Sequence, residues 1–149
     1  VPAHLDYFDG SMFEMVVSIA KKYPHYVAYD FMRKKTTYKQ LIQKIEICAK
    51  ALKTIGIREG DRVTIALPNC PQGICMFYAV NLVGGIANMI HPLSSEKEIE
   101  FYLNESQSVT VITLDQFYHK IEAIRKHTSI VNVIIASIKD ELSPSIKAG

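Results

Sequence analysis

His91 is the polar residue that stands in the best position for binding a ligand. It follows the apolar segment 86–90, which has the composition of a strand, and open α/β sheets bind ligands beyond the carboxyl ends of their strands. Cys70 is the second candidate, because it stands at the start of an expected helix, where the helix dipole favours a thiolate. We favour a structural role at the rim of the sheet for His91, and the role of a small residue in the first helical turn for Cys70.

No motif for binding a nucleotide phosphate occurs in the chain. A P-loop needs a Gly-Lys pair within Gly-x-x-x-x-Gly-Lys-Ser/Thr, and no such pair is present. The dinucleotide fingerprint Gly-x-Gly-x-x-Gly and the nucleophile motif Gly-x-Ser-x-Gly are also absent. The pair Gly84-Gly85 lies between an expected helix and an expected strand, which is the wrong polarity for a phosphate loop. We expect it to end that helix.

The histidines and cysteines do not have the spacing of a metal site. His119 and His127 are eight residues apart on one expected helix, too far for the four-residue zinc pair. Cys70 and Cys75 are five apart, and Cys48 lies in another element. An odd number of irregularly spaced cysteines also argues against a disulfide framework. We therefore expect reduced thiols and a cytoplasmic location.

The remaining charged residues have ordinary structural explanations. Glu98 completes a capping box, and Glu100 and Glu105 belong to a solvated helix face. The basic run 33–35 is interpreted as a hairpin tip, and a net charge of +2 does not predict a nucleic-acid partner. The residues alone therefore assign no catalytic, cofactor-binding or metal-binding site.

The elements that would position these residues form an α/β pattern. Ser11, Thr37 and Ser95 each begin a capping box of the form Ser/Thr-x-x-Glu/Gln. Gly56 and Ile57 have the types expected where a helix ends in a Schellman motif. Strands are expected at 27–31, 35–37, 62–67, 86–90, 109–113 and 130–136, and helices at 8–23, 37–55, 70–83, 95–106 and 116–127, with Asn69 capping the helix 70–83 and Pro71 near its start.

This alternation predicts a largely parallel sheet flanked by helices, with a short N-terminal hairpin. The chain has 149 residues, 48% of them hydrophobic and 21% charged, which suits one folded domain and argues against disorder. Segment 63–95 has no charged residue, but proline and glycine interrupt it. We expect this segment to form a buried strand, a helix and a second strand. We do not expect it to span a membrane. No signal-peptide pattern is found near the N-terminus.

Several segments in order resemble a known family. They are 36–41, 52–63 (which begins Leu-Lys-Thr-Ile-Gly-Ile-Arg-Glu-Gly-Asp), 66–69, 79–87, 92–93 with Glu98, and 109–112. Together they resemble the N-terminal region of adenylate-forming enzymes, the AMP-forming acyl-CoA synthetases and their relatives among luciferases and peptide-synthetase adenylation domains. The resemblance covers residues 10–136. Residues 1–149 are accordingly expected to be part of the large N-terminal domain of such an enzyme.

The resemblance implies a ligase that joins ATP, with Mg²⁺, to a small-molecule carboxylic acid, and then passes the acyl group to a thiol such as coenzyme A. The family's Ser/Thr/Gly-rich loop, its ribose-binding acidic residue and its C-terminal lysine have no counterparts in this sequence, and most of the acyl pocket is built from later segments. We therefore expect an inactive N-terminal lobe, with no cofactor of its own, that packs against the remainder of the same polypeptide. The alternative is a self-contained α/β binding module with a small ligand near His91.

Overall fold

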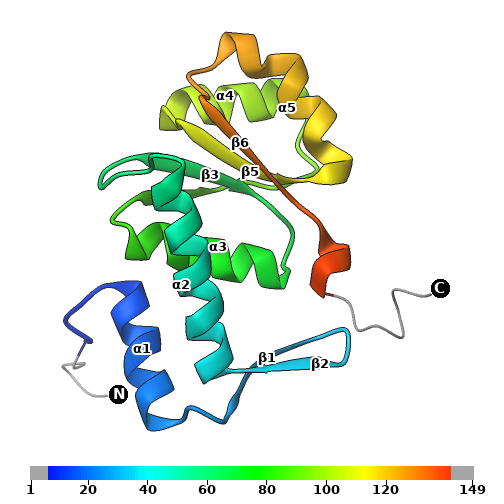
Figure 1. The fold of residues 1–149 in the computed structure, drawn as a ribbon. Coiled ribbons are helices and arrows are strands. Elements are labelled where there is room, and N and C mark those ends of the chain that lie inside the picture. The colour runs from blue at the N-terminus through cyan, green and yellow to red at the C-terminus, as the bar shows by residue number, and fades with distance from the viewer. Residues whose placement is uncertain (1–6, 142–149) are drawn as a thin grey trace, which may run out of the picture.

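A four-stranded parallel sheet forms the centre of the computed structural model, which describes residues 7–141. The strands lie in the order β4-β3-β5-β6 (Figure 1). All three pairings are parallel, so the expected sheet is confirmed. The strands are β3 (Arg62–Ala66), β4 (Ile86–Met89), β5 (Thr110–Leu114) and β6 (Asn132–Ala136).

Helices cover both faces of this sheet (Figure 1). One face carries α2 (Tyr38–Thr54) and α3 (Pro71–Leu82), with α1 (Met12–Lys22) packed against both. The other face carries α4 (Glu96–Ser106) and α5 (Tyr118–Ile124). The expected hairpin is also confirmed as β1 (Val27–Phe31) and β2 (Lys34–Thr37), which pair antiparallel beside α2.

Each face of the sheet has its own hydrophobic core. Ile65 and Ile112 pack toward α2 and α3, together with Leu52. Val111 packs toward α4 and α5, together with Leu103. This two-sided burial explains why segment 63–95 has no charged residue: it forms β3, α3 and β4, as predicted. No helix in the described part of the chain is long and apolar enough to cross a membrane.

Glycines end two helices as the sequence predicts. After α2, the amide of Gly56 donates to the carbonyl of Lys53 at 3.0 Å, and the amide of Ile57 donates to Leu52 at 3.1 Å. These two bonds define a Schellman motif. The same pair of bonds follows α3 at Gly84 and Gly85, and Gly84 has a φ of +78°, a conformation that glycine adopts without strain.

The helices differ from the prediction in three places. The first helix begins at Met12 and not at residue 8, because Ser11 caps its start. Asn69 is not the cap of α3; Cys70 is, and no side chain caps that end. The reason is Pro71 at the first helical position, whose ring forces the preceding residue into an extended backbone. The expected single helix 116–127 is divided into 3₁₀ turns at Asp115–Phe117 and Arg125–His127 around α5. No side chain caps the N-terminal end of α5, and at its C-terminal end the Thr128 hydroxyl donates to the carbonyl of Arg125 at 2.9 Å. Tight 3₁₀ turns at both ends satisfy further free backbone groups.

Of the basic run 33–35, only Arg33 lies in the turn of the hairpin. Met32 and Arg33 form the turn, with φ values of 49° and 67°. Lys34 is already the first residue of β2, one residue earlier than predicted.

The three capping boxes are confirmed at Ser11, Thr37 and Ser95. A long-range cap was not predicted: the side-chain oxygen of Asn81, on α3, accepts from the amide of Phe13 at 2.9 Å. Phe13 is in the first turn of α1, so this bond satisfies a free amide there and fixes α1 against α3.

The capping box of α4 makes the stability of the chain depend on pH. The amide of Ser95 donates to a Glu98 carboxylate oxygen at 2.8 Å, and the Ser95 hydroxyl donates to it at 2.9 Å. These bonds favour the ionised form, so the pKa of Glu98 lies below its ordinary value. A lowered folded-state pKa stabilises the chain above the unfolded-state pKa, and this stabilisation disappears as the pH falls through the folded-state pKa.

We expect Glu98→Gln to lose less stability on acidification than the parent chain does. Glutamine keeps the accepting oxygen, as Gln40 does in the box of α2, but it does not titrate. Urea midpoints measured from pH 7 to pH 3 should therefore diverge most at neutral pH and converge only as the pH falls below 4.5, the ordinary pKa of glutamate. Glu105→Gln, at the other end of α4, serves as the control. Parallel pH profiles for Glu98→Gln and the parent would contradict the prediction.

Candidate functional site

The topology creates a crevice at the carboxyl edge of the sheet. After β3 the chain turns to α3 on one face, and after β5 it turns to α5 on the opposite face (Figure 1). β3 and β5 are neighbours in the sheet, so their following segments separate from each other. Open α/β sheets bind ligands at such a switch point.

A cavity of about 630 Å³ lies at this switch point, and we call it the switch-point cavity. Three segments meet there, each following the carboxyl end of a strand. Its lining is Leu67, Pro68 and Asn69 after β3, Met89, Ile90, His91, Pro92 and Leu93 at the end of β4, and Gln116 and Phe117 after β5.

His91 lines this cavity and follows the carboxyl end of β4, as the sequence predicts. Its side chain is exposed, and its Nδ1 accepts a hydrogen bond from the amide of Leu93 at 3.2 Å. The bond holds the turn that follows β4. Next to this turn, the Lys120 ammonium donates to the carbonyl of Ser94 at 2.9 Å and ties the loop to α5. The imidazole therefore helps to hold the loop, and its ring lies at the cavity rim.

The chemistry available in the switch-point cavity is limited. Its polar side chains are Asn69, His91 and Gln116, and its lining contains no carboxylate and no lysine or arginine. Within residues 7–141, no group of three metal-ligating side chains lies close enough to hold an ion. The cavity can bind apolar groups and form hydrogen bonds, but it does not contain the charge that a nucleotide triphosphate or Mg²⁺ would need.

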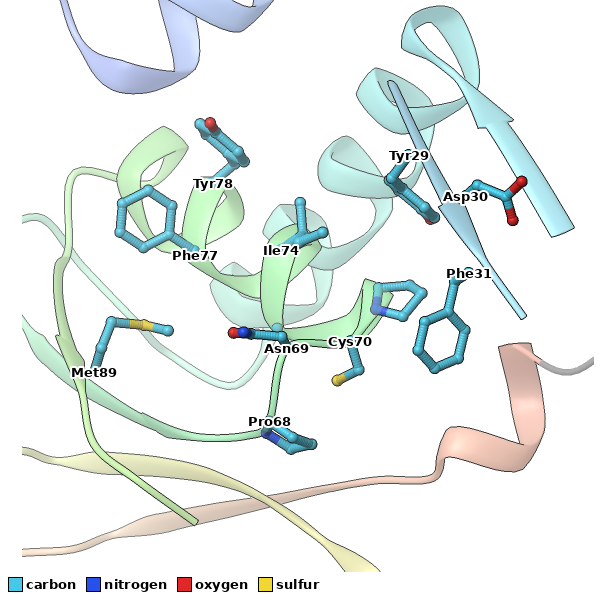
Figure 2. A pocket seen from close by; sticks show the side chains of 12 residues that line it. Tyr29, Asp30, Phe31, Pro68, Asn69, Cys70, Ile74, Phe77, Tyr78 and Met89 are labelled. Carbon is cyan, nitrogen blue, oxygen red and sulfur yellow. The ribbon is translucent and has the colours of Figure 1, made fainter. Parts of the chain in front are cut away.

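A second cavity, of about 510 Å³, adjoins the first, since Pro68, Asn69 and Met89 line both. We call it the aromatic cavity. Figure 2 shows it between the hairpin strand β1 and the N-terminal half of α3. Its lining is Tyr29, Asp30, Phe31, Pro68, Asn69, Cys70, Pro71, Gly73, Ile74, Phe77, Tyr78 and Met89.

The structure separates the other residues that the sequence singled out. Cys70 is 2% exposed and lines the aromatic cavity, as the cap of α3 and not as a residue of its first turn. Cys48 and Cys75 also form no disulfide. His119 is exposed on α5, and the Nδ1 of His127 is 3.6 Å from a Glu100 carboxylate oxygen on the surface.

The aromatic cavity was not predicted from the sequence. One signal could have found its first wall. Tyr29 and Phe31 flank Asp30 in a short strand, and this alternation places both rings on one side of the strand. The sequence contains no comparable sign that this side faces α3.

Comparisons with known proteins agree with this fold. The sequence profile described as "AMP-binding enzyme" matches residues 17–148. The long-chain-fatty-acid–CoA ligase of Bacillus subtilis is 31% identical over 142 residues, which are 95% of this chain and 25% of that protein. The corresponding ligase of Salmonella typhimurium is 28% identical over 134 residues, 89% of this chain and 24% of that protein. The chain thus spans about a quarter of the length of these relatives.

Solved structures give the same picture. A long-chain-fatty-acid-CoA ligase from Archaeoglobus fulgidus superposes with a TM-score of 0.82 at 19% identity, over 89% of this chain and 28% of that one. A fatty acyl CoA synthetase from Mycobacterium tuberculosis superposes with a TM-score of 0.79 at 29% identity, over 85% of this chain and 26% of that one.

Proposed function

The chain belongs to the AMP-binding enzyme family, and from this membership we propose that it is the N-terminal lobe of an ATP-dependent acid–thiol ligase. Such a ligase activates a carboxylic acid as an acyl-adenylate with release of pyrophosphate, and then transfers the acyl group to a thiol such as coenzyme A. The observation that carries the proposal is the 31% identity with a long-chain-fatty-acid–CoA ligase along 95% of this chain. Its name makes a long-chain fatty acid the first acid to test.

The described residues do not fit ATP and Mg²⁺ on their own, because the switch-point cavity has neither a carboxylate for the metal nor a cation for the phosphates. We assign the binding of ATP, Mg²⁺ and coenzyme A to the remainder of a longer polypeptide, and we propose that this lobe alone is inactive. The lobe itself contributes a sheet covered by helices, and the carboxyl edge of this sheet is lined mostly by apolar residues. A cytoplasmic location accords with three cysteines that form no disulfide.

Exposed apolar residues support packing of this lobe against further protein. Met12, Met15 and Ile19 form a half-exposed stripe along α1, and Ile135 is 51% exposed on the edge strand β6. Edge strands with exposed apolar side chains are normally covered. The remainder of the same polypeptide is the partner that we propose for these surfaces.

The test is an assay of pyrophosphate release with ATP, Mg²⁺, palmitate and coenzyme A. We expect no release from the 149-residue chain, and release from the protein expressed from the complete reading frame that encodes it. Omitting palmitate, and then omitting Mg²⁺, provides the controls. Turnover by the 149-residue chain, or a complete protein that activates no acid in a panel of fatty and aryl acids, would overturn the proposal.

The alternative function is a binding module without catalysis. The placement of His91 at a cavity of about 630 Å³ is the observation that favours it. It predicts that the 149-residue chain binds a small ligand at this cavity and that the complete reading frame lacks a Ser/Thr/Gly-rich loop with a lysine. Finding that loop in the reading frame would exclude this alternative.

A further inference from the structure

One stripe of α2 changes from polar to apolar along the helix. Gln40, Gln43, Lys44, Ile47 and Cys48 recur at intervals of three and four residues, so they lie on one side of the helix. From Gln40 to Cys48 the stripe extends about 12 Å along the helix axis. Its polar end is the end nearest the hairpin, because β2 leads directly into α2 (Figure 1).

The apolar end of the stripe lines a cavity of about 310 Å³, which we call the apolar cavity. It lies between α2, the first half of α3 and the end of β6. The Gln72 amide donates to the carbonyl of Ser137 at 2.8 Å and holds the end of β6 beside α3. Ile47 is 67% exposed here, so an alkyl chain in the cavity would cover it. The lining is Lys44, Ile47, Cys48, Gln72, Cys75, Met76, Ile134, Ile135, Ala136 and Ser137.

The polar end of the stripe lines a second cavity, of about 250 Å³, which we call the lysine cavity. Its other wall is β2. The two cavities adjoin, since Lys44 and Ile47 line both. The lining of the lysine cavity is Lys34, Lys35, Thr36, Gln40, Gln43, Lys44 and Ile47.

The charge of the described residues around the two cavities is positive and lies at one end. Three lysines line the lysine cavity, and no carboxylate is among the described lining residues of either cavity. Asp30 is opposite Lys35 in the hairpin, but it lines the aromatic cavity. An ammonium has three N–H donors, so a lysine that already has one partner still binds an anion. Half-buried Lys44 stands at the junction, where its methylene stem suits the apolar side and its ammonium the polar side.

We propose that the apolar cavity and the lysine cavity together bind an anionic amphiphile, with its alkyl chain in the apolar cavity and its phosphate or carboxylate head group at the lysines. An uncharged chain would leave the lysines unused, and an inorganic anion would leave the apolar cavity unfilled. No residue lines both this site and the switch-point cavity, so the proposal does not depend on the ligase chemistry.

The first experiment titrates the 149-residue chain with decyl phosphate, below the concentration at which it forms micelles, and records the methyl resonances of isoleucine and methionine. We expect saturable shifts at Ile47 and Met76, which line the apolar cavity, and none at Ile121, which is buried on the other face of the sheet. Decanol, which has the chain but no charge, and methyl phosphate, which has the charge but almost no chain, should both bind more weakly. Decanoate is titrated in parallel, and its affinity relative to decyl phosphate identifies the preferred head group.

The second experiment repeats the titrations with Lys44→Gln. Loss of the cation should weaken decyl phosphate binding by about threefold to tenfold and leave decanol binding unchanged. Lys53→Gln removes the same charge from the last turn of α2, outside both cavities, and should bind like the parent. Raising the salt concentration from about 0.01 M to 0.1 M should weaken decyl phosphate binding and not decanol binding.

A third variant tests the other end of the site. Ile47→Gln removes an apolar side chain that lines both cavities, and it should weaken decyl phosphate and decanol alike. Because Ile47 is mostly exposed, the variant should unfold at nearly the same urea concentration as the parent.

Three results would overturn the proposal. The first is the absence of saturable shifts at Ile47 and Met76. The second is unchanged decyl phosphate affinity in Lys44→Gln. The third is decanol or methyl phosphate binding as tightly as decyl phosphate, which would show that the two cavities do not act as one site for an anionic amphiphile.

Discussion

Ile65→Ala is expected to destabilise the chain by about 2–5 kcal/mol, the range for removing a large aliphatic side chain from a packed core. Ile65 is fully buried in β3, where it pairs with Met89 on one side and Ile112 on the other. Its side chain packs in the core that joins the sheet to α2 and α3. Because a domain of this size is stable by only about 5–15 kcal/mol, the loss is a large fraction of the total.

The measurement is urea denaturation followed by far-ultraviolet circular dichroism. The free energies of unfolding are compared for variants that share one m-value, the slope of that free energy against urea concentration. Ile135→Ala is the matched control, since it removes the same atoms from β6 at a position that is 51% exposed. We expect that variant to lose less than about 1 kcal/mol. Equal losses for the two variants would show that the core between β3 and the α2–α3 layer is not packed as the structure has it.

Local sequence signals predicted most of this fold because they act within a few residues. The capping box of Thr37 with Gln40 predicted the start of α2, and the Schellman motif at Gly56 predicted its end. The charge-free segment 63–95 predicted β3, α3 and β4 correctly, because a strand buried on both faces has no polar alternation. Each of these features is decided by the backbone and its nearest neighbours.

Features that depend on distant residues could not be predicted from the sequence. Asn81 caps α1 through a bond to Phe13, which is 68 residues away. The position of His91 after a strand was predicted, but its place at a switch point follows from the order of the strands in the sheet, which the sequence does not state. The aromatic cavity likewise exists only because the hairpin packs beside α3, and the residues of β1 do not indicate this neighbour.

A buried polar cluster illustrates the same limit and carries the second large effect. Thr64 is fully buried in β3, beside Ile65, and its hydroxyl lies 2.7 Å from the hydroxyl of Ser108. The Asn88 amide of β4 donates to the same Thr64 oxygen at 2.9 Å. Thr64 therefore joins β4 to the segment before β5 through one oxygen atom.

Thr64→Val is expected to destabilise the chain by about 1–3 kcal/mol. Valine has nearly the shape of threonine, so no cavity forms, but Asn88 loses its acceptor and Ser108 loses one partner. Ser108 retains its contact with the Ser106 hydroxyl at 2.7 Å, which limits the loss. The matched control is Thr110→Val on β5, which is equally buried but has only a 3.4 Å contact with the Asn132 amide. It should lose less.

A double-mutant cycle separates the hydrogen bonds from changes in packing. If Thr64 and Ser108 act as one cluster, Thr64→Val combined with Ser108→Ala should cost less than the sum of the two single changes. Additive losses would mean that the two hydroxyls are not coupled, despite their 2.7 Å separation.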